Sequence, residues 1–160
     1  MGTPEPRSRP ARPEVARIVE VGTKDVTDRE AVAECTITMT PEACGALIAG
    51  TPKGDPLQAA RIAGIMAVKR TPDLLPFCHP VAVTGAEVAV EPERASGRIR
   101  VHATVRARDR TGVEMEALTA SAVAALSLYD TAKAYDRSAV ISELRLVSKR
   151  GGKSGDFRAS

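Results

Sequence analysis

Apolar and polar positions alternate most regularly over residues 98–108, where arginine fills most of the polar positions. A strand with one buried and one solvated face has this pattern. Residues 81–91 predict the hairpin partner of this strand, with a turn over 92–97. Looser alternation over 30–39 and the apolar residues of 140–148 predict a first and a last strand. The buried side chains of the regular strand are expected to be Ile99, Val101, Ala103, Val105 and Ala107.

Two helices are predicted between the first strand and the hairpin. Thr40 is a suitable N-cap for a short helix that begins at Pro41. Asp55 followed by Pro56 marks the start of a second helix. We expect this helix to end at Pro72, because proline lacks the N–H that continues the hydrogen-bond ladder.

A third, longer helix follows the hairpin. Thr111 and Glu114 have the spacing of a capping box, which predicts a helix of about 22 residues ending near Lys133. This helix is apolar on several faces, which suggests contacts between subunits. Residues 73–80 contain two prolines and are predicted to form a loop.

The order of elements is strand, two helices, two strands, long helix, strand. This is a βαββαβ arrangement whose first crossover is split into two helices, and it predicts an α+β ferredoxin-like sandwich. An antiparallel sheet would be covered by helices on one face. We expect residues 1–16 to be a disordered tail, 17–148 a single catalytic domain, and 149–160 a flexible tail rich in glycine and lysine that contributes to the site.

Composition excludes several classes of protein. The chain has 160 residues and a net charge of +3, and its only aromatic residues are Phe77, Tyr129, Tyr135 and Phe157. Base stacking needs aromatic platforms, so a nucleic-acid partner is not expected. No apolar run is long enough to span a membrane, which needs about 20 residues. Three cysteines without a CxxC motif indicate a reduced, cytoplasmic setting and give no zinc-site spacing.

The arginine-rich side of the regular strand has two interpretations. Five arginines between positions 98 and 110 could bind phosphate. A solvated sheet face is the better explanation, because Glu87 and Glu91 on the partner strand can pair with Arg98 and Arg100. An RNA-recognition module of the same topology is excluded, because neither central strand carries an aromatic residue.

Four side chains are candidates for chemistry, and each also has a structural explanation. Lys53 precedes a helix N-terminus, where anions bind, or it is an exposed lysine in a capped loop. His79 could transfer protons, or it could be a structural loop residue. Asp130 and Lys133 lie on one helix face and form either an acid–base pair or a surface ion pair.

Two further segments have open interpretations. Glu114 and Glu116 lie in the first turn of the long helix, where an acidic residue interacts favourably with the helix dipole. Residues 151–154 resemble the end of a phosphate-binding loop, but the leading glycine of that motif is missing. The cations in and beside this segment could close over an anion: Lys149, Arg150 and Lys153.

Several strings of the sequence together resemble one family. The chain is similar, over about residues 18 to 158, to the cyclic pyranopterin monophosphate synthases, the accessory protein C family of molybdenum cofactor (molybdopterin) biosynthesis. The resemblance rests on KGD at 53–55, ARIAGI at 60–65, CHP at 78–80, TGVEMEALTA at 111–120, YD at 129–130 with Lys133, and GGKSGD at 151–156.

The resemblance implies a reaction and an assembly. The substrate would be 3′,8-cyclo-7,8-dihydro-GTP, and the lyase product would be cyclic pyranopterin monophosphate, with release of pyrophosphate. The family is hexameric, a trimer of dimers, with sites between subunits. A non-catalytic nucleotide-binding regulatory domain is the alternative, since ferredoxin-like domains have many functions.

The resemblance also implies roles for particular residues. Asp130 would be the acid/base and Lys133 its partner, with Lys53 and His79 also catalytic. The substrate would be lined by Phe77, Cys78, His79, Met115 and Glu116, with Glu114, Arg29 and Lys149 nearby. No metal ligand or cofactor is implied, although a divalent cation could accompany the triphosphate.

The sequence departs from the family at three places. Phe77 stands where an aliphatic residue is common, residues 19–22 differ from the usual Val-Asp-Val-Ser, and the loop at 51–52 is shorter than in relatives.

The spacing of the two best acids has a consequence for the assembly. Glu116 and Asp130 are 14 positions apart on one predicted helix, which separates them by about 21 Å along its axis. If both serve one reaction centre, they must come from different subunits.

Overall fold

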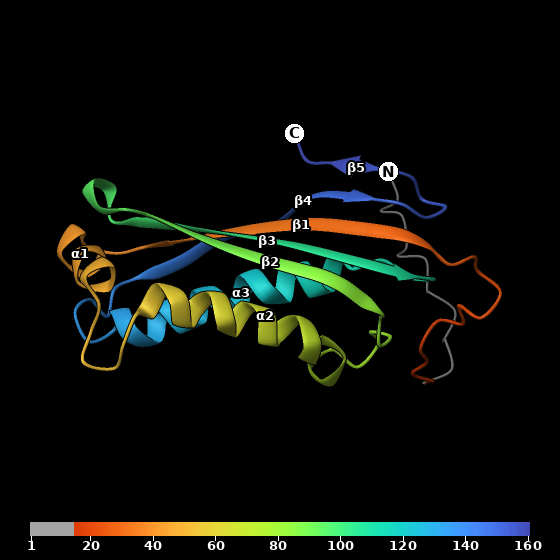
Figure 1. Cartoon of the computed structure of the whole chain (residues 1–160), viewed down its shortest axis with the longest axis horizontal. Coiled ribbons are helices and arrows are strands. Elements are labelled where there is room, and N and C mark those ends of the chain that lie inside the picture. Colours follow the sequence, from red (N-terminus) through yellow and green to blue (C-terminus); the bar gives the residue numbers. More distant parts are fainter. Residues whose placement is uncertain (1–14) are drawn as a thin grey trace, which may run out of the picture.

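The computed structural model describes residues 15–160. Most of the tail predicted at 1–16 lies outside these residues. The described chain forms a five-stranded antiparallel sheet in the order β2-β3-β1-β4-β5, and helices cover one of its faces (Figure 1). The order of the first four strands confirms the ferredoxin-like sandwich. The strands are β1 (Thr27–Thr38), β2 (Val83–Glu93), β3 (Arg98–Asp109), β4 (Val140–Arg150) and β5 (Phe157–Arg158).

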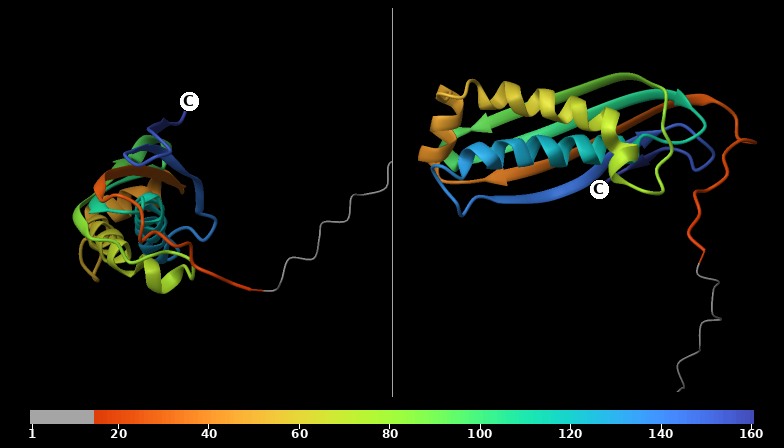
Figure 2. Two further views of the ribbon diagram at one scale, coloured as in Figure 1. Left: turned by 90° about the vertical axis from the view of Figure 1, so that its right-hand side faces the viewer. Right: turned by 90° about the horizontal axis from the view of Figure 1, so that it is seen from below.

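Within residues 15–160, three α-helices accompany the sheet. The long pair, α2 (Pro56–Leu74) and α3 (Glu114–Ala132), runs antiparallel beneath the sheet, and the short α1 (Pro41–Ala49) lies at one end of it (Figure 2). Thr40 caps α1 and Asp55 caps α2 by accepting main-chain N–H groups, as predicted. A 3₁₀ turn, Arg94–Ser96, links β2 to β3. No helix of the described chain is long and apolar enough to cross a membrane.

The core lies between the sheet and the two long helices. The inward side chains of β3 are at most 2% exposed, which confirms the buried parity predicted from the alternation. Small residues of α3, mainly alanines, pack against β1 and β3. Because these side chains are short, α3 lies close to the sheet, and its remaining faces meet α2 or solvent.

The second helix does not end at Pro72 as we expected, because α2 continues to Leu74. Proline at this point removes one hydrogen bond from the last turn only. The N–H of Leu75 still donates to the carbonyl of Thr71 over 3.0 Å. The predicted loop at 73–80 therefore loses its first two residues to α2.

The prediction of a capping box at the start of the third helix is wrong. Val113 is the N-cap and makes no side-chain capping bond, and α3 has 19 residues instead of about 22. Glu114 is the first residue of the helix, where a capping box needs it at the third position. Its carboxylate instead lies 3.4 Å from Nζ of Lys149 on β4.

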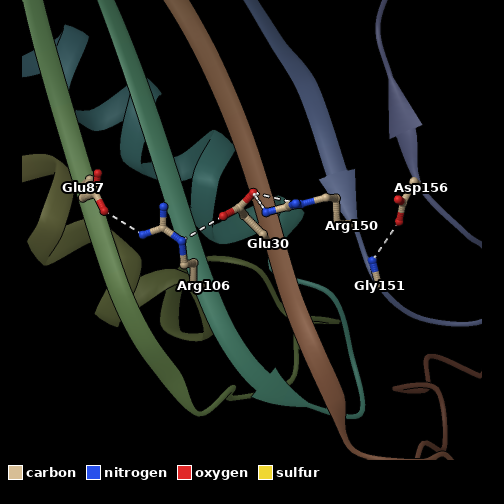
Figure 3. A network of polar contacts seen from close by, with 6 residues as sticks. All are labelled: Glu30, Glu87, Arg106, Arg150, Gly151 and Asp156. Atoms are coloured by element: carbon tan, nitrogen blue, oxygen red, sulfur yellow. Dashed lines mark hydrogen bonds and ion pairs between the residues drawn. The ribbon is translucent and has the colours of Figure 1, made fainter.

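The charged pairs on the outer sheet face differ from those predicted. Glu87 binds Arg106 over 2.6 Å, and Arg106 also binds Glu30 over 2.8 Å, so this arginine joins three strands (Figure 3). Arg98 turns away from β2 and reaches Glu143 on β4 over 3.3 Å. Glu91 faces Arg100 in the strand register but lies 3.9 Å from His102, with no ion pair to Arg100 in the described chain. The face is charged and solvated, as expected, but long side chains select diagonal partners.

The C-terminal segment contains more regular structure than we predicted. β4 extends two residues beyond the predicted end at 148, and the missed strand β5 pairs with it through Ser148 and Lys149. Arg150 binds Glu30 on β1 over 2.8 Å (Figure 3). The segment 151–156 is thus a turn between two paired strands.

Candidate active site

The residues expected to carry chemistry form two clusters, one at each end of α3; Figure 1 shows the course of this helix along the sheet. Glu116 and Asp130, both on this helix, are about 21 Å apart along its axis. We call the first group the N-terminal cluster and the second the C-terminal cluster. The N-terminal cluster contains Arg29, Phe77, Cys78, His79, Glu114, Met115, Glu116 and Lys149. The C-terminal cluster contains Lys53, Asp130 and Lys133.

The C-terminal cluster is built around an exposed ion pair. Nζ of Lys133 lies 2.7 Å from Oδ1 of Asp130. Hydrogen bonding by Lys133 is the main cause of a lowered pKa at Asp130, and the charge of Lys53 lowers this pKa further. Asp130 is therefore a carboxylate at neutral pH, and two ammonium groups lie near it.

Lys53 is presented by a tight turn before α2. Thr51 and Gly54 exchange two main-chain hydrogen bonds of 2.9 Å, and Gly54 has a φ of 114°, which favours glycine. Asp55 accepts the N–H groups of the first turn of α2 over 2.9 and 3.1 Å. Because Asp55 occupies these donors, the lysine ammonium is the group that remains for an anion at this helix start.

Six residues of the N-terminal cluster line an acidic hollow of about 350 Å³. Phe77, Cys78 and His79 from the loop after α2 lie opposite the first turn of α3, which supplies Glu114, Met115 and Glu116. Phe77 is 60% exposed, so its ring is a wall of the hollow and not part of the core. Burial raises the pKa of the Cys78 thiol, and the nearby Glu116 and Glu114 carboxylates raise it further.

Glu116 is the buried acid of this hollow. The residue is only 1% exposed, and its Oε1 has no hydrogen-bond partner in the described chain. Desolvation raises the pKa of this carboxyl, and the Glu114 carboxylate adds to the rise. A buried polar atom without a hydrogen-bond partner costs free energy. A ligand bound in the hollow could supply a hydrogen-bond partner for this oxygen.

A second, basic hollow of about 490 Å³ adjoins the acidic one and shares Thr111, Gly112 and Glu114 with it. Arg29 from β1 and Lys149 from β4, both expected at the site, line it. Three further cations also line the basic hollow: Lys24, Arg110 and Lys153. An acidic and a basic hollow with common walls suit a ligand that has a proton-exchanging part and a polyanionic part.

Comparison with known proteins identifies the family. The model of the MoaC family matches residues 18–152. The chain belongs to the MoaC family. Relatives named cyclic pyranopterin monophosphate synthase are 55% identical in a Roseiflexus species, 53% in Parvibaculum lavamentivorans and 52% in Pelotomaculum thermopropionicum. The matches cover 89%, 90% and 89% of this chain and 90%, 91% and 84% of the relatives.

Sequence reasoning on this MoaC-family chain missed Lys24 and Arg110 as lining residues. Lys24 precedes β1 and Arg110 follows β3, and the register pairs Thr27 with Asp109. Residues that flank the paired ends of antiparallel strands lie at the same sheet edge. The side chain of Arg110 donates to the carbonyl of Lys24 over 2.9 Å. The positions of these two basic residues beside the paired strand ends would have been enough to predict that they lie together at this edge of the sheet.

Proposed function

We propose that the protein is a lyase that converts 3′,8-cyclo-7,8-dihydro-GTP into cyclic pyranopterin monophosphate and releases pyrophosphate, in molybdenum cofactor biosynthesis. The observation that carries this proposal is the pair of adjoining hollows in a chain of the MoaC family. One hollow carries acids and a histidine, and the other carries five cations. The relatives named above support the same activity.

The basic hollow would hold the triphosphate. Its cations offset the negative charge of the phosphates, which is greatest on the leaving pyrophosphate. A cyclic phosphate forms when a sugar hydroxyl bonds to the α-phosphorus and the bond from this phosphorus to the bridging oxygen breaks. The hydroxyl proton passes to a base, and pyrophosphate leaves with the bond electrons. Arg29 is suited to binding the phosphates because its planar guanidinium can donate two hydrogen bonds to one phosphate.

The acidic hollow would hold the purine part of the substrate, where the imidazole ring is opened and the pterin is formed. Glu116 is buried, and desolvation raises its pKa, so it holds a proton more readily than an exposed carboxyl and is suited to act as an acid. His79 lies in the same hollow, where its ring nitrogens can donate or accept a hydrogen bond. Cys78, Met115 and Phe77 would form the less polar walls against the rings.

The site is proposed to be shared between two chains, as part of a hexamer that is a trimer of dimers. One chain cannot place Asp130 beside Glu116, because they lie at opposite ends of α3. If two α3 helices paired antiparallel about a twofold axis, the C-terminal cluster of each chain would approach the N-terminal cluster of the other. Exposed apolar residues on α3, Met115 and Leu126, are 39% and 57% exposed and could form such a contact.

In the shared site, Asp130, Lys133 and Lys53 of one chain would meet the substrate bound in the hollows of the other. Asp130 would accept protons as a carboxylate, and the two lysines would neutralise charge as it develops. The reaction is proposed to need no cofactor; a divalent cation could enter with the triphosphate. We place the protein in the cytoplasm, where its three free thiols would stay reduced.

The test is turnover of the cyclised GTP intermediate by the purified protein. Pyrophosphate and a pterin product should appear together and in equal amounts. A nucleotide-binding regulatory domain would bind the intermediate and release neither product. A parallel assay with a chelator measures whether the divalent cation contributes.

A further inference from the structure

The glycine-rich turn after β4 is built closely against Arg29. Gly151, Gly152 and Gly155 have φ angles of 92°, 86° and 71°, a region that favours glycine. The N–H of Gly155 donates to the carbonyl of Gly152 over 3.1 Å and closes a four-residue turn. A Cβ atom on Gly152 would overlap the Arg29 guanidinium, whereas one on Gly155 would meet nothing within 4 Å.

The end of β3 holds the same guanidinium on another side. Nε of Arg29 donates to the carbonyl of Asp109, and Nη2 donates to the carbonyl of Arg110, each over 3.3 Å. Arginine has five N–H donors, so three have no partner within residues 15–160. The guanidinium therefore lies in a slot between two main-chain carbonyls and the main chain of Gly152, and its remaining donors are available to the basic hollow.

The turn also contacts Lys149, the second expected cation of the hollow. Nζ of Lys149 donates to Oγ of Ser154 over 2.6 Å and lies 3.4 Å from Oε1 of Glu114. The turn itself is fastened by the N–H of Gly151, which donates to Oδ1 of Asp156 over 3.2 Å (Figure 3). One short segment thus touches both cations.

We propose that Gly152, in the turn after β4, is a positioning residue of the basic hollow that sets the direction of the Arg29 guanidinium. The inference rests on the proposed function, because it takes this hollow as the triphosphate site. A side chain at position 152 would displace the end of a flexible arginine and would not press on main chain. Substitution there should therefore leave the fold intact while turning the guanidinium away from its ligand.

Gly152→Ala and Gly155→Ala form a matched pair of variants. Both replace a glycine that has positive φ, so both strain the turn. Only the methyl group at position 152 reaches Arg29. The probe is inorganic tripolyphosphate, titrated calorimetrically into the intact protein, and the same variants are assayed for kcat and KM with the cyclised GTP intermediate.

Gly152→Ala and Arg29→Ala should each weaken tripolyphosphate binding about tenfold, the usual effect of losing a hydrogen bond to a charged group. The double variant should bind no more weakly than Arg29→Ala alone, because the glycine acts through the arginine. Gly155→Ala should bind like the parent protein within about twofold. For Gly152→Ala the KM for the intermediate should rise more than kcat falls.

Three outcomes would overturn the inference. If Arg29→Ala weakens binding and Gly152→Ala does not, the hollow stands as the phosphate site and the positioning role is wrong. If Gly155→Ala weakens binding as much as Gly152→Ala, general strain in the turn explains the loss. If Arg29→Ala binds tripolyphosphate normally, the hollow is not the triphosphate site, and the proposed function loses that part as well. Should Gly152→Ala fail to fold, Gly152→Asn, which tolerates positive φ, takes its place.

Discussion

Asp130 keeps its negative charge through its neighbours and not through burial. It is exposed, and its pKa is lowered first by the hydrogen bond from Lys133. A carboxylate of this kind is ionised at neutral pH and so has a free site for a proton, but its lowered pKa makes it a weak base. Its role as a proton acceptor therefore depends on the substrate and the side chains that surround it once two chains form the shared site.

Asp130→Asn removes the charge and nearly preserves the shape of the side chain. Turnover should fall by about 10²–10⁴-fold, the usual contribution of an acid/base group, while the thermal midpoint changes little. Asp73→Asn is the matched control, because Asp73 forms an equally exposed ion pair with Arg70 three residues away. If the Asp130→Asn protein keeps most of its turnover, Asp130 is not the acid/base group of the reaction.

Lys53 should act in binding more than in proton transfer. Lys53→Ala is expected to weaken binding of the triphosphate substrate about tenfold, because an ammonium group facing a polyanion is lost. Added salt should imitate part of the effect in the parent protein, since the lysine is in a solvent-exposed turn. Lys69→Ala, at another exposed lysine, provides the comparison. Affinity that is independent of both the substitution and salt would contradict the assignment.

At the scale of elements, the outer face of the sheet is held by a charged network across four strands. Glu30 on β1 binds Arg106 on β3 and Arg150 on β4, and Arg106 also binds Glu87 on β2. The pKa of Glu30 is lowered, chiefly by the hydrogen bond from Arg106. This network fixes the end of β4 from which the glycine turn starts.

The lowered pKa of Glu30 gives this network a pH dependence of known sign. The ionised form is favoured in the folded protein, so the stabilisation is complete above the unfolded pKa and is lost as pH falls through the folded value. Glu30→Gln should cost about 1 kcal/mol at pH 7, and the difference from the parent should shrink below about pH 4. Urea unfolding at fixed chain concentration measures both. A gap that stays constant with pH would show that Glu30 stabilises through packing instead.

Local sequence signals predicted the elements well where one residue or one period decides the outcome. The parity of β3 and the caps Thr40 and Asp55 needed no information from distant residues. The capping box failed because the Glu114 carboxylate faces Lys149, which is 35 residues further along the chain. Helix α2 continues past Pro72 because a proline in the last turn removes only one hydrogen bond. The rule that proline ends a helix applies to helix interiors and overstates the free-energy cost at this position.

The candidate site was predictable in its parts but not in its arrangement. Resemblance to the family predicted most of the site residues, and helix geometry predicted the distance between Glu116 and Asp130 along α3. The basic hollow could not be foreseen as a whole, because its cations come from three separate segments, 24–29, 110 and 149–153, which meet only through the strand register. Lys24 and Arg110 belong to it for that reason.

At the scale of the molecule, the shared site predicts complementation between two inactive variants. Glu116→Gln damages one cluster and Asp130→Asn the other. After subunit exchange at equal amounts, half of the pairs are mixed and each has one intact site, so activity should recover to about a quarter of the parent level. Exchange is followed with fluorescently labelled chains. No recovery despite proven exchange would show that the two acids do not serve one site.

The distance along α3 also determines how activity responds to dilution. If each catalytic centre needs opposite ends of two helices, a lone chain contains two halves and no working centre. Well below the dissociation constant of the pair, the number of centres should then fall with the square of the chain concentration, because association follows mass action. Specific activity would become a direct gauge of assembly. Below that dissociation constant, a loss of chains would lower activity more than in proportion to the number of chains lost.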